Sequence, residues 1–155
     1  LPRGTAVRAV IQRVCRASVQ VGAETVGEIG PGLLALVGVA ADDGPADIAY
    51  IAGKIRDLRV FDDEYGKMNL ALGDTGGAVL VVSQFTLHGD ARKGRRPSFD
   101  RAAPADEGRT IFDAVVAALR ASGVTVETGT YRAHMQVELV NDGPVTILID
   151  SRREF

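Results

Sequence analysis

The chain has few cysteines and histidines and lacks tryptophan: its 155 residues include one cysteine, two histidines and no tryptophan. A single cysteine excludes an internal disulfide, which fits a reducing, cytoplasmic compartment. Cys15 lies in a stretch where apolar residues alternate, and this pattern predicts a buried structural thiol. With His88 and His134 as the two histidines, a zinc site lacks its ligands, so we expect neither metal nor cofactor.

The chain also lacks an apolar run near the ~20 residues that cross a bilayer, and it lacks a secretory signal pattern, so no membrane partner is expected. Its net charge of −2 gives no general attraction to polyanions. DNA is therefore not an expected partner, and any contact with RNA must be local. Residues 1–6 are expected to be a linker remnant or a disordered N-terminus, and residues 7–155 a single domain.

Hydrophobic periodicity predicts an α+β domain in which two main helices pack on a mixed or antiparallel, barrel-like sheet. One helix is expected after Asp42-Asp43-Gly44-Pro45 and extends to about Leu58, because apolar residues recur there at helical spacing. The second is expected from about Pro104 to Ala121, with Gly123 as its stop. A turn is expected at residues 73–77. Strand-like runs fill most of the remainder: residues 7–14, a hairpin over 16–29, 33–39, 58–61, 68–70, 78–87, 124–128, 135–140 and 145–150.

Common catalytic motifs are missing: the chain has no Gly-x-Ser-x-Gly elbow, phosphate-binding loop or dinucleotide fingerprint. A Ser/His/Asp triad can be assembled on paper from Ser83, His88 and Asp90, but nothing in their spacing requires it. We interpret both histidines as surface or loop residues.

Polar residues follow the strand-like run Ala78–Val82 directly, in the segment Ser83-Gln84-Phe85-Thr86. One interpretation is a strand end whose hydroxyls bond to nearby backbone groups. The other is a site in which the backbone N–H groups of Phe85 and Thr86 face a carbonyl or oxyanion. In that case Gln84 and Thr86 supply further hydrogen bonds.

A second polar segment, Asn141-Asp142-Gly143-Pro144-Val145-Thr146, follows the run 135–140. It is ordinary turn material, but Gly143-Pro144 has unusual conformational freedom, since glycine accepts many φ values and about 5–6% of X–Pro bonds are cis. A cis bond here would give a rigid tip without side chains. Such a tip can test the substituents on a substrate's α-carbon, which suits selection by handedness.

A basic run lies just beyond the first polar segment. Four of the 18 basic residues, Arg92, Lys93, Arg95 and Arg96, fall within residues 91–99. A charge run is usually a solvated loop. Its position directly after a candidate site favours contact with phosphates.

Several separated motifs, in the right order over residues 7–150, resemble the D-aminoacyl-tRNA deacylase family. They are residues 9–14, Ala17-Ser18-Val19, Gly66-Lys67-Met68-Asn69, Val81 to Leu87, Arg96-Pro97-Ser98-Phe99 and Met135 to Thr146. The resemblance implies a cytoplasmic editing hydrolase of translation quality control. It would cleave the ester of D-aminoacyl-tRNA, and of glycyl-tRNA mischarged on tRNA(Ala). It also implies a homodimer with active sites at the subunit interface.

The resemblance further implies roles for particular residues. Phe85 and Thr86 would bind the substrate carbonyl through their amides, with Ser83 and Gln84 shaping the pocket, and the 2′-hydroxyl of the tRNA would activate water. A cis Gly143–Pro144 tip, projecting into the partner's pocket, would exclude L-aminoacyl groups. Met135 and Arg13 are candidates for holding the tip. The expected tRNA contacts are Arg92, Lys93, Arg95, Arg96, Pro97, Ser98 and Phe99.

The sequence departs from the family pattern at Tyr131-Arg132-Ala133-His134-Met135, where the family has Phe and small residues before the methionine. The bulky, charged Arg132 would narrow the pocket mouth or reach a phosphate. Two other functions stay open: a non-catalytic dimer that binds RNA ends, and an esterase with Thr86 or Ser83 as its nucleophile.

Overall fold

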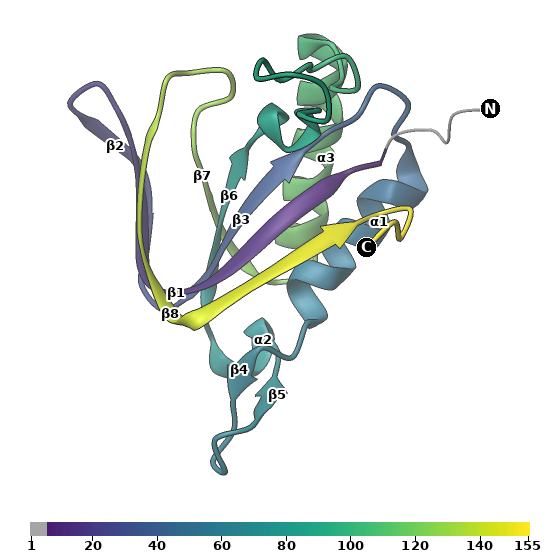
Figure 1. Cartoon of the computed structure of the whole chain (residues 1–155). Helices are drawn as coiled ribbons and strands as arrows, with labels where there is room; N and C mark the ends of the chain where they lie inside the picture. Colours follow the sequence, from purple (N-terminus) through teal and green to yellow (C-terminus); the bar gives the residue numbers. More distant parts are fainter. Residues whose placement is uncertain (1–5) are drawn as a thin grey trace.

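The computed structural model describes residues 6–155, so residues 1–5 of the expected N-terminal remnant lie outside the described residues. The fold is organised around one long strand (Figure 1). This strand, β1 (Arg8–Val21), pairs with β8 (Gln136–Asp150) along nearly its whole length. Its other edge pairs first with β3 (Gly32–Gly38) and then with β2 (Glu24–Ile29). All three neighbours run antiparallel to β1.

Two parallel pairings extend the sheet beyond β3. They join β3 to β6 (Ala78–Ser83) and β6 to β7 (Thr125–Thr128). The sheet therefore has six strands and mixed pairing, and its curvature brings β2 into contact with β6 and β7. The expected α+β class with a mixed, barrel-like sheet is confirmed.

Helices α1 (Pro45–Asp57) and α3 (Ala105–Ala121) cover one face of this sheet, as Figure 1 shows. Helix α1 begins where the sequence indicates, because the Asp47 carboxylate accepts a hydrogen bond of 2.9 Å from the Gly44 N–H. Helix α3 is followed by Gly123 in the left-handed conformation, with φ +90°. None of the helices formed by residues 6–155 is long and apolar enough to cross a bilayer.

The small elements differ somewhat from the expected ones. A short hairpin of β4 (Phe61–Asp62) and β5 (Met68–Leu70) is followed by a one-turn helix, α2 (Leu72–Thr75), where a turn was expected. The strand expected over residues 78–87 ends at Ser83 and gives way to a 3₁₀ turn, η1 (Phe85–His88).

The core has two layers, and β1 contributes to both. Ala9 and Ile11 pack with α1 and α3 on the helical side of the sheet, whereas Val14, Ala17 and Val19 pack inside the curl formed with β2 and β6. In a regular strand Ala17 and Val19 would lie on the same face as Ala9 and Ile11, because side chains alternate strictly between faces. An irregularity in β1 therefore has to separate the two halves.

The irregularity is a bulge at Cys15. Val14 faces Asn141 and Arg16 faces Val140, so β1 has one residue more than β8 at this point. The extra residue shifts the alternation, and Cys15 is exposed. The prediction of a buried Cys15 was therefore wrong, because a pattern continued through a bulge assigns every later residue to the wrong face.

A second irregularity lies on the other strand. Between the pairs Gln12–Thr146 and Val14–Asn141, β8 has four residues, 142–145, opposite the single residue Arg13. The structure therefore has one strand over residues 136–150 with a wide bulge, where the sequence indicated two strands separated by a turn.

Candidate active site

The first wall of the candidate site is the point where β6 ends. The Gln84 N–H donates a hydrogen bond of 2.8 Å to the Val37 carbonyl, and the chain then turns into η1. No residue in the described part of the chain accepts a hydrogen bond from the N–H of Phe85 or Thr86, as is usual for the first donors of a helical turn. The Gln84 amide donates to the Thr86 hydroxyl.

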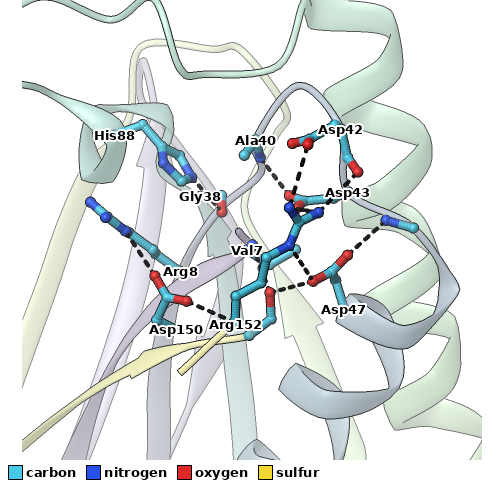
Figure 2. Close-up of polar contacts among 12 residues, drawn as sticks. Val7, Arg8, Gly38, Ala40, Asp42, Asp43, Asp47, His88, Asp150 and Arg152 are labelled. Carbon is cyan, nitrogen blue, oxygen red and sulfur yellow. Dashed lines mark hydrogen bonds and ion pairs between the residues drawn. The ribbon is translucent and has the colours of Figure 1, made fainter. Parts of the chain in front are cut away.

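His88, the last residue of η1, anchors this turn to β3. It is buried, and its Nε2 lies 3.1 Å from the Gly38 carbonyl oxygen (Figure 2). Burial lowers the pKa of His88, so the ring is neutral and Nε2 carries the proton that it donates. The interpretation of His88 as a surface or loop residue was therefore wrong. Its burial depends on the approach of β3, which has no signal in the local sequence.

The second wall is the segment that joins β7 to β8. Tyr131 fixes it to the start of α3, since its hydroxyl donates a hydrogen bond of 2.9 Å to the Ala105 carbonyl. The Tyr131 ring also packs against Phe112, with ring centres 5.9 Å apart. This fixed segment brings residues 131–135 opposite the end of β6.

A pocket of about 470 Å³ lies between the two walls. Its lining residues are Val82, Ser83, Gln84, Phe85, Ala103, Ala105, Tyr131, Arg132, Ala133, His134, Met135 and Val137. The structure thus brings together four of the expected site residues, Ser83, Gln84, Phe85 and Met135. Thr86 is exposed on the same 3₁₀ turn but does not line the pocket.

The Gly143–Pro144 tip lies elsewhere on the same chain, in the wide bulge of β8. Its peptide bond is cis, and both residues are exposed. Arg13 and Asn141 hold the bulge. The Arg13 Nε donates a hydrogen bond of 2.7 Å to the Asp142 carbonyl, and the Asn141 side chain both accepts from the Val145 N–H at 2.8 Å and donates to the Val145 carbonyl at 3.1 Å. Neither Gly143 nor Pro144 lines the pocket of its own chain.

The basic run forms an exposed loop beside the pocket. Backbone hydrogen bonds between Asp90 and Ser98, of 2.7 and 2.9 Å, close its base. Phe99 packs edge-on against Phe85, with ring centres 5.2 Å apart, and so connects the loop to the pocket wall. The Arg92 guanidinium binds the Asp90 carboxylate and holds its pKa well below the usual range. Within residues 6–155, no ion pair engages Lys93, Arg95 or Arg96.

Comparison with known proteins identifies the family. Residues 10–150 match the family described as D-Tyr-tRNA(Tyr) deacylase. The chain is 60% identical over 146 residues to the D-aminoacyl-tRNA deacylase of Heliobacterium modesticaldum, which covers 94% of this chain and 97% of that protein. It is also 60% identical over 149 residues to the D-aminoacyl-tRNA deacylase of Anaeromyxobacter dehalogenans, at 96% and 100% coverage. The chain belongs to the D-Tyr-tRNA(Tyr) deacylase family.

Solved structures share the fold of this chain. The chain superposes on one titled c-Myc DNA Unwinding Element Binding Protein with a TM-score of 0.86 and 38% identity, over 92% of this chain and 97% of that one. A probable eukaryotic D-amino acid tRNA deacylase superposes with a TM-score of 0.83 at 18% identity, over 94% and 99%, and shows the shared fold. The resemblance to this family is confirmed, and membership makes the chain a hydrolase that acts on ester bonds.

Sequence reasoning missed two residues that build the site. Asn141 spans the wide bulge, and its signal was an amide placed directly before Asp-Gly-Pro, a position from which side chains often bond to the following backbone. Tyr131 fixes the second wall through a helix 26 residues away in sequence, and no local pattern indicated that contact.

Proposed function

We propose that this chain hydrolyses the ester bond of D-aminoacyl-tRNA, and of glycyl-tRNA mischarged on tRNA(Ala), releasing the amino acid and reusable tRNA. The observation that carries the proposal is the pocket at the end of β6, where the backbone N–H groups of Phe85, in the lining, and of Thr86, on the same turn, have no hydrogen-bond partner among residues 6–155. The family and its relatives, named D-aminoacyl-tRNA deacylase, give the substrate class.

In this mechanism the Phe85 and Thr86 N–H groups donate to the ester carbonyl oxygen. They stabilise the negative charge that develops when water adds to the carbonyl carbon. The bond from that carbon to the ribose oxygen then breaks, and the proton lost by the water ends on the ribose oxygen. The 2′-hydroxyl of the terminal ribose activates the water.

The lining of the pocket supports a mechanism without a side-chain nucleophile activated by a protein base. No aspartate or glutamate lines it, and among the described residues no hydrogen bond connects the Ser83 hydroxyl to His134. An aminoacyl ester is a reactive substrate, so positioning and polarisation of its carbonyl supply much of the required rate.

Selection for handedness is assigned to Gly143 and Pro144 of a second copy of the chain. The tip is exposed, Arg13 and Asn141 hold it in place, and it does not line the pocket of its own chain. These observations are consistent with a tip that enters the pocket of a neighbouring subunit. The proposed assembly is thus a cytoplasmic homodimer, with each active site completed by the partner. Met135 lies on the opposite wall, where it would face the incoming tip.

The loop of residues 92–99 is assigned to the 3′ end of the tRNA. Lys93, Arg95 and Arg96 supply free positive charge, and the contact of Phe99 with Phe85 places that charge next to the pocket. Arg92, Pro97 and Ser98 belong to the same contact surface, with Arg92 partly neutralised by Asp90.

The proposal is tested by comparing the deacylation rates of two substrates that differ only in the handedness of the amino acid. The same tRNA is charged with D- or L-tyrosine, and release of the amino acid is followed over time. We expect release of D-tyrosine and protection of L-tyrosine. Binding of both without release would leave only the RNA-end-binding function, and equal release of both would remove the selective role of the tip.

Two changes separate the chemical mechanisms. A terminal 2′-deoxyadenosine, with the ester at the 3′ position, should abolish turnover, whereas unchanged turnover would contradict assistance by the tRNA. Thr86→Ala should leave turnover close to that of the parent, because the backbone N–H remains. Lost turnover with intact substrate binding would instead favour the Thr86-nucleophile esterase.

A further inference from the structure

Arg132 occupies an unusual backbone position at the pocket. Its φ is +64°, in the left-handed region that few residues other than glycine adopt, and one other non-glycine in the described chain, Arg153, shares this conformation. An arginine there carries a conformational cost of about 1 kcal/mol or more. The position therefore retains a charged side chain at some expense to stability.

The turn that carries Arg132 is firmly held. Tyr131, the preceding residue, is fixed by its hydrogen bond to Ala105 and by packing on Phe112, and the Arg109 guanidinium lies 5.8 Å from its ring centre. The Ala133 N–H closes the turn on the Thr130 carbonyl at 3.2 Å. Arg132 is thus presented to the pocket from a rigid support.

The charge around Arg132 is not balanced within the pocket. Arg132 lines the pocket together with His134, and the lining includes no carboxylate; Asp106 and Glu107, in the first turn of α3, are not part of it. Among residues 6–155, no hydrogen bond or ion pair engages the Arg132 guanidinium. A free cation beside a pocket without acids favours an anionic occupant.

We propose that Arg132 binds an anionic group of the substrate at the mouth of this pocket. The inference rests on the proposed function, because it takes the aminoacyl end of a tRNA as the occupant. That end offers two anions of suitable chemistry: the side-chain carboxylate of an acidic D-amino acid, and a phosphate of the terminal nucleotides. Both accept the paired hydrogen bonds that a guanidinium donates.

The chain offers a matched pair of variants. Arg132→Gly removes the guanidinium and suits the left-handed backbone, so it should fold at least as well as the parent. Arg153→Gly makes the same change at φ +62°, on the C-terminal turn, where the guanidinium stacks on Tyr50. It controls for lost charge and relieved strain. Arg132→Lys keeps the positive charge but loses the paired N–H donors of the guanidinium.

Substrates with and without a carboxylate identify the anion. One tRNA is charged with D-aspartate or with D-asparagine, and kcat/KM is measured for the parent and the three variants at several salt concentrations. A charge-assisted hydrogen bond lost from the substrate complex corresponds to about tenfold or more. The loss should fall mainly on KM, because Arg132 binds and does not take part in the chemical step.

The two sources of the anion give different results. Binding of the side chain predicts that Arg132→Gly lowers kcat/KM for D-aspartyl-tRNA and not for D-asparaginyl-tRNA. Binding of a phosphate predicts an equal loss for both, with a salt dependence weaker by about 0.7 in the log–log slope. Arg132→Lys should recover part of either loss.

The inference would be overturned if Arg132→Gly and Arg153→Gly had the same kcat/KM on both substrates at every salt concentration. That result would leave the proposed function intact. Failure of the parent protein to release any D-amino acid would instead overturn the proposed function. The two failures are therefore distinguishable in the same experiment.

Discussion

The Arg13 Nε lies 2.7 Å from the carbonyl oxygen of Asp142, the residue directly before the Gly143–Pro144 tip. The same guanidinium donates a hydrogen bond of 2.8 Å to the Val60 carbonyl and forms a 3.3 Å ion pair with Asp62. One nearly buried side chain therefore joins the wide bulge of β8 to the segment between α1 and β4. The position of the tip depends on a residue in the middle of β1.

Arg13→Ala should destabilise the protein and loosen the tip. Two carbonyl groups lose a charged donor, and the expected cost is about 2–3 kcal/mol of the free energy of unfolding, measured in urea. Arg16→Ala is the control, because Arg16 lies on the same strand and forms an exposed ion pair with Glu138. Its cost should stay within about 1 kcal/mol. Equal costs would show that the contacts of Arg13 contribute nothing specific.

Gly143→Ala should weaken discrimination between D- and L-aminoacyl-tRNA. A Cβ atom at Gly143 would lie 2.4 Å from the Val145 backbone nitrogen, so the backbone of the tip has to move. Gly30→Ala is the control, since a Cβ there meets no atom within 4 Å. The measurement is the ratio of deacylation rates for the two enantiomers. A Gly143→Ala variant with the parent's ratio would argue against a role of the tip in selection.

Asp43 should make stability depend on pH. Burial raises the pKa of Asp43 from 3.8 to about 7. Within residues 6–155 its Oδ1 has no hydrogen-bond partner and lies 4.0 Å from the Arg152 guanidinium, whereas Oδ2 accepts from the Ala40 N–H (Figure 2). At a pH between these two pKa values, Asp43 keeps its proton in the folded protein and releases it in the unfolded chain. The free energy of unfolding should therefore fall as the pH rises from about 4 to 7.

Asp43→Asn isolates this effect, because the amide oxygen can still accept from Ala40. The variant should lose the contribution of Asp43, so its stability relative to the parent should increase from pH 5 to pH 8. Burial lowers the pKa of His88 and gives a dependence of the opposite sign, but His88 is present in both proteins and cancels in the difference. A constant difference between the two unfolding curves would contradict the prediction.

The basic loop should govern the salt dependence of turnover. Arg95→Ala should lower kcat/KM at low salt and reduce the log–log dependence on salt by about 0.7, the value for one phosphate contact on a single strand. Arg59→Ala is a control of equal charge, since Arg59 lies near the β4–β5 hairpin and bonds to Asn69. Identical salt profiles for the two variants would mean that loss of any positive charge has the same effect.

Local patterns predicted the helices and the polar end of β6, because helical spacing, a Pro45 start and a Gly123 stop act within a few residues. They failed where distant segments decide the outcome. Cys15 is exposed because of a bulge defined by β8, and His88 is buried because β3 supplies its acceptor. The roles of Ser83, Gln84 and Thr86, and the homodimer, stay predictions.

The two-sided packing of β1 has a consequence for how this protein can vary. Ala17 and Val19 reach the layer of Val14 because Cys15 adds one residue to the strand. Removing Cys15 would rotate Ala17 and Val19 toward water, whereas changing its side chain would not. Evolution and engineering can thus exchange the side chain at this point freely, but the number of residues between Gln12 and Arg16 must be kept.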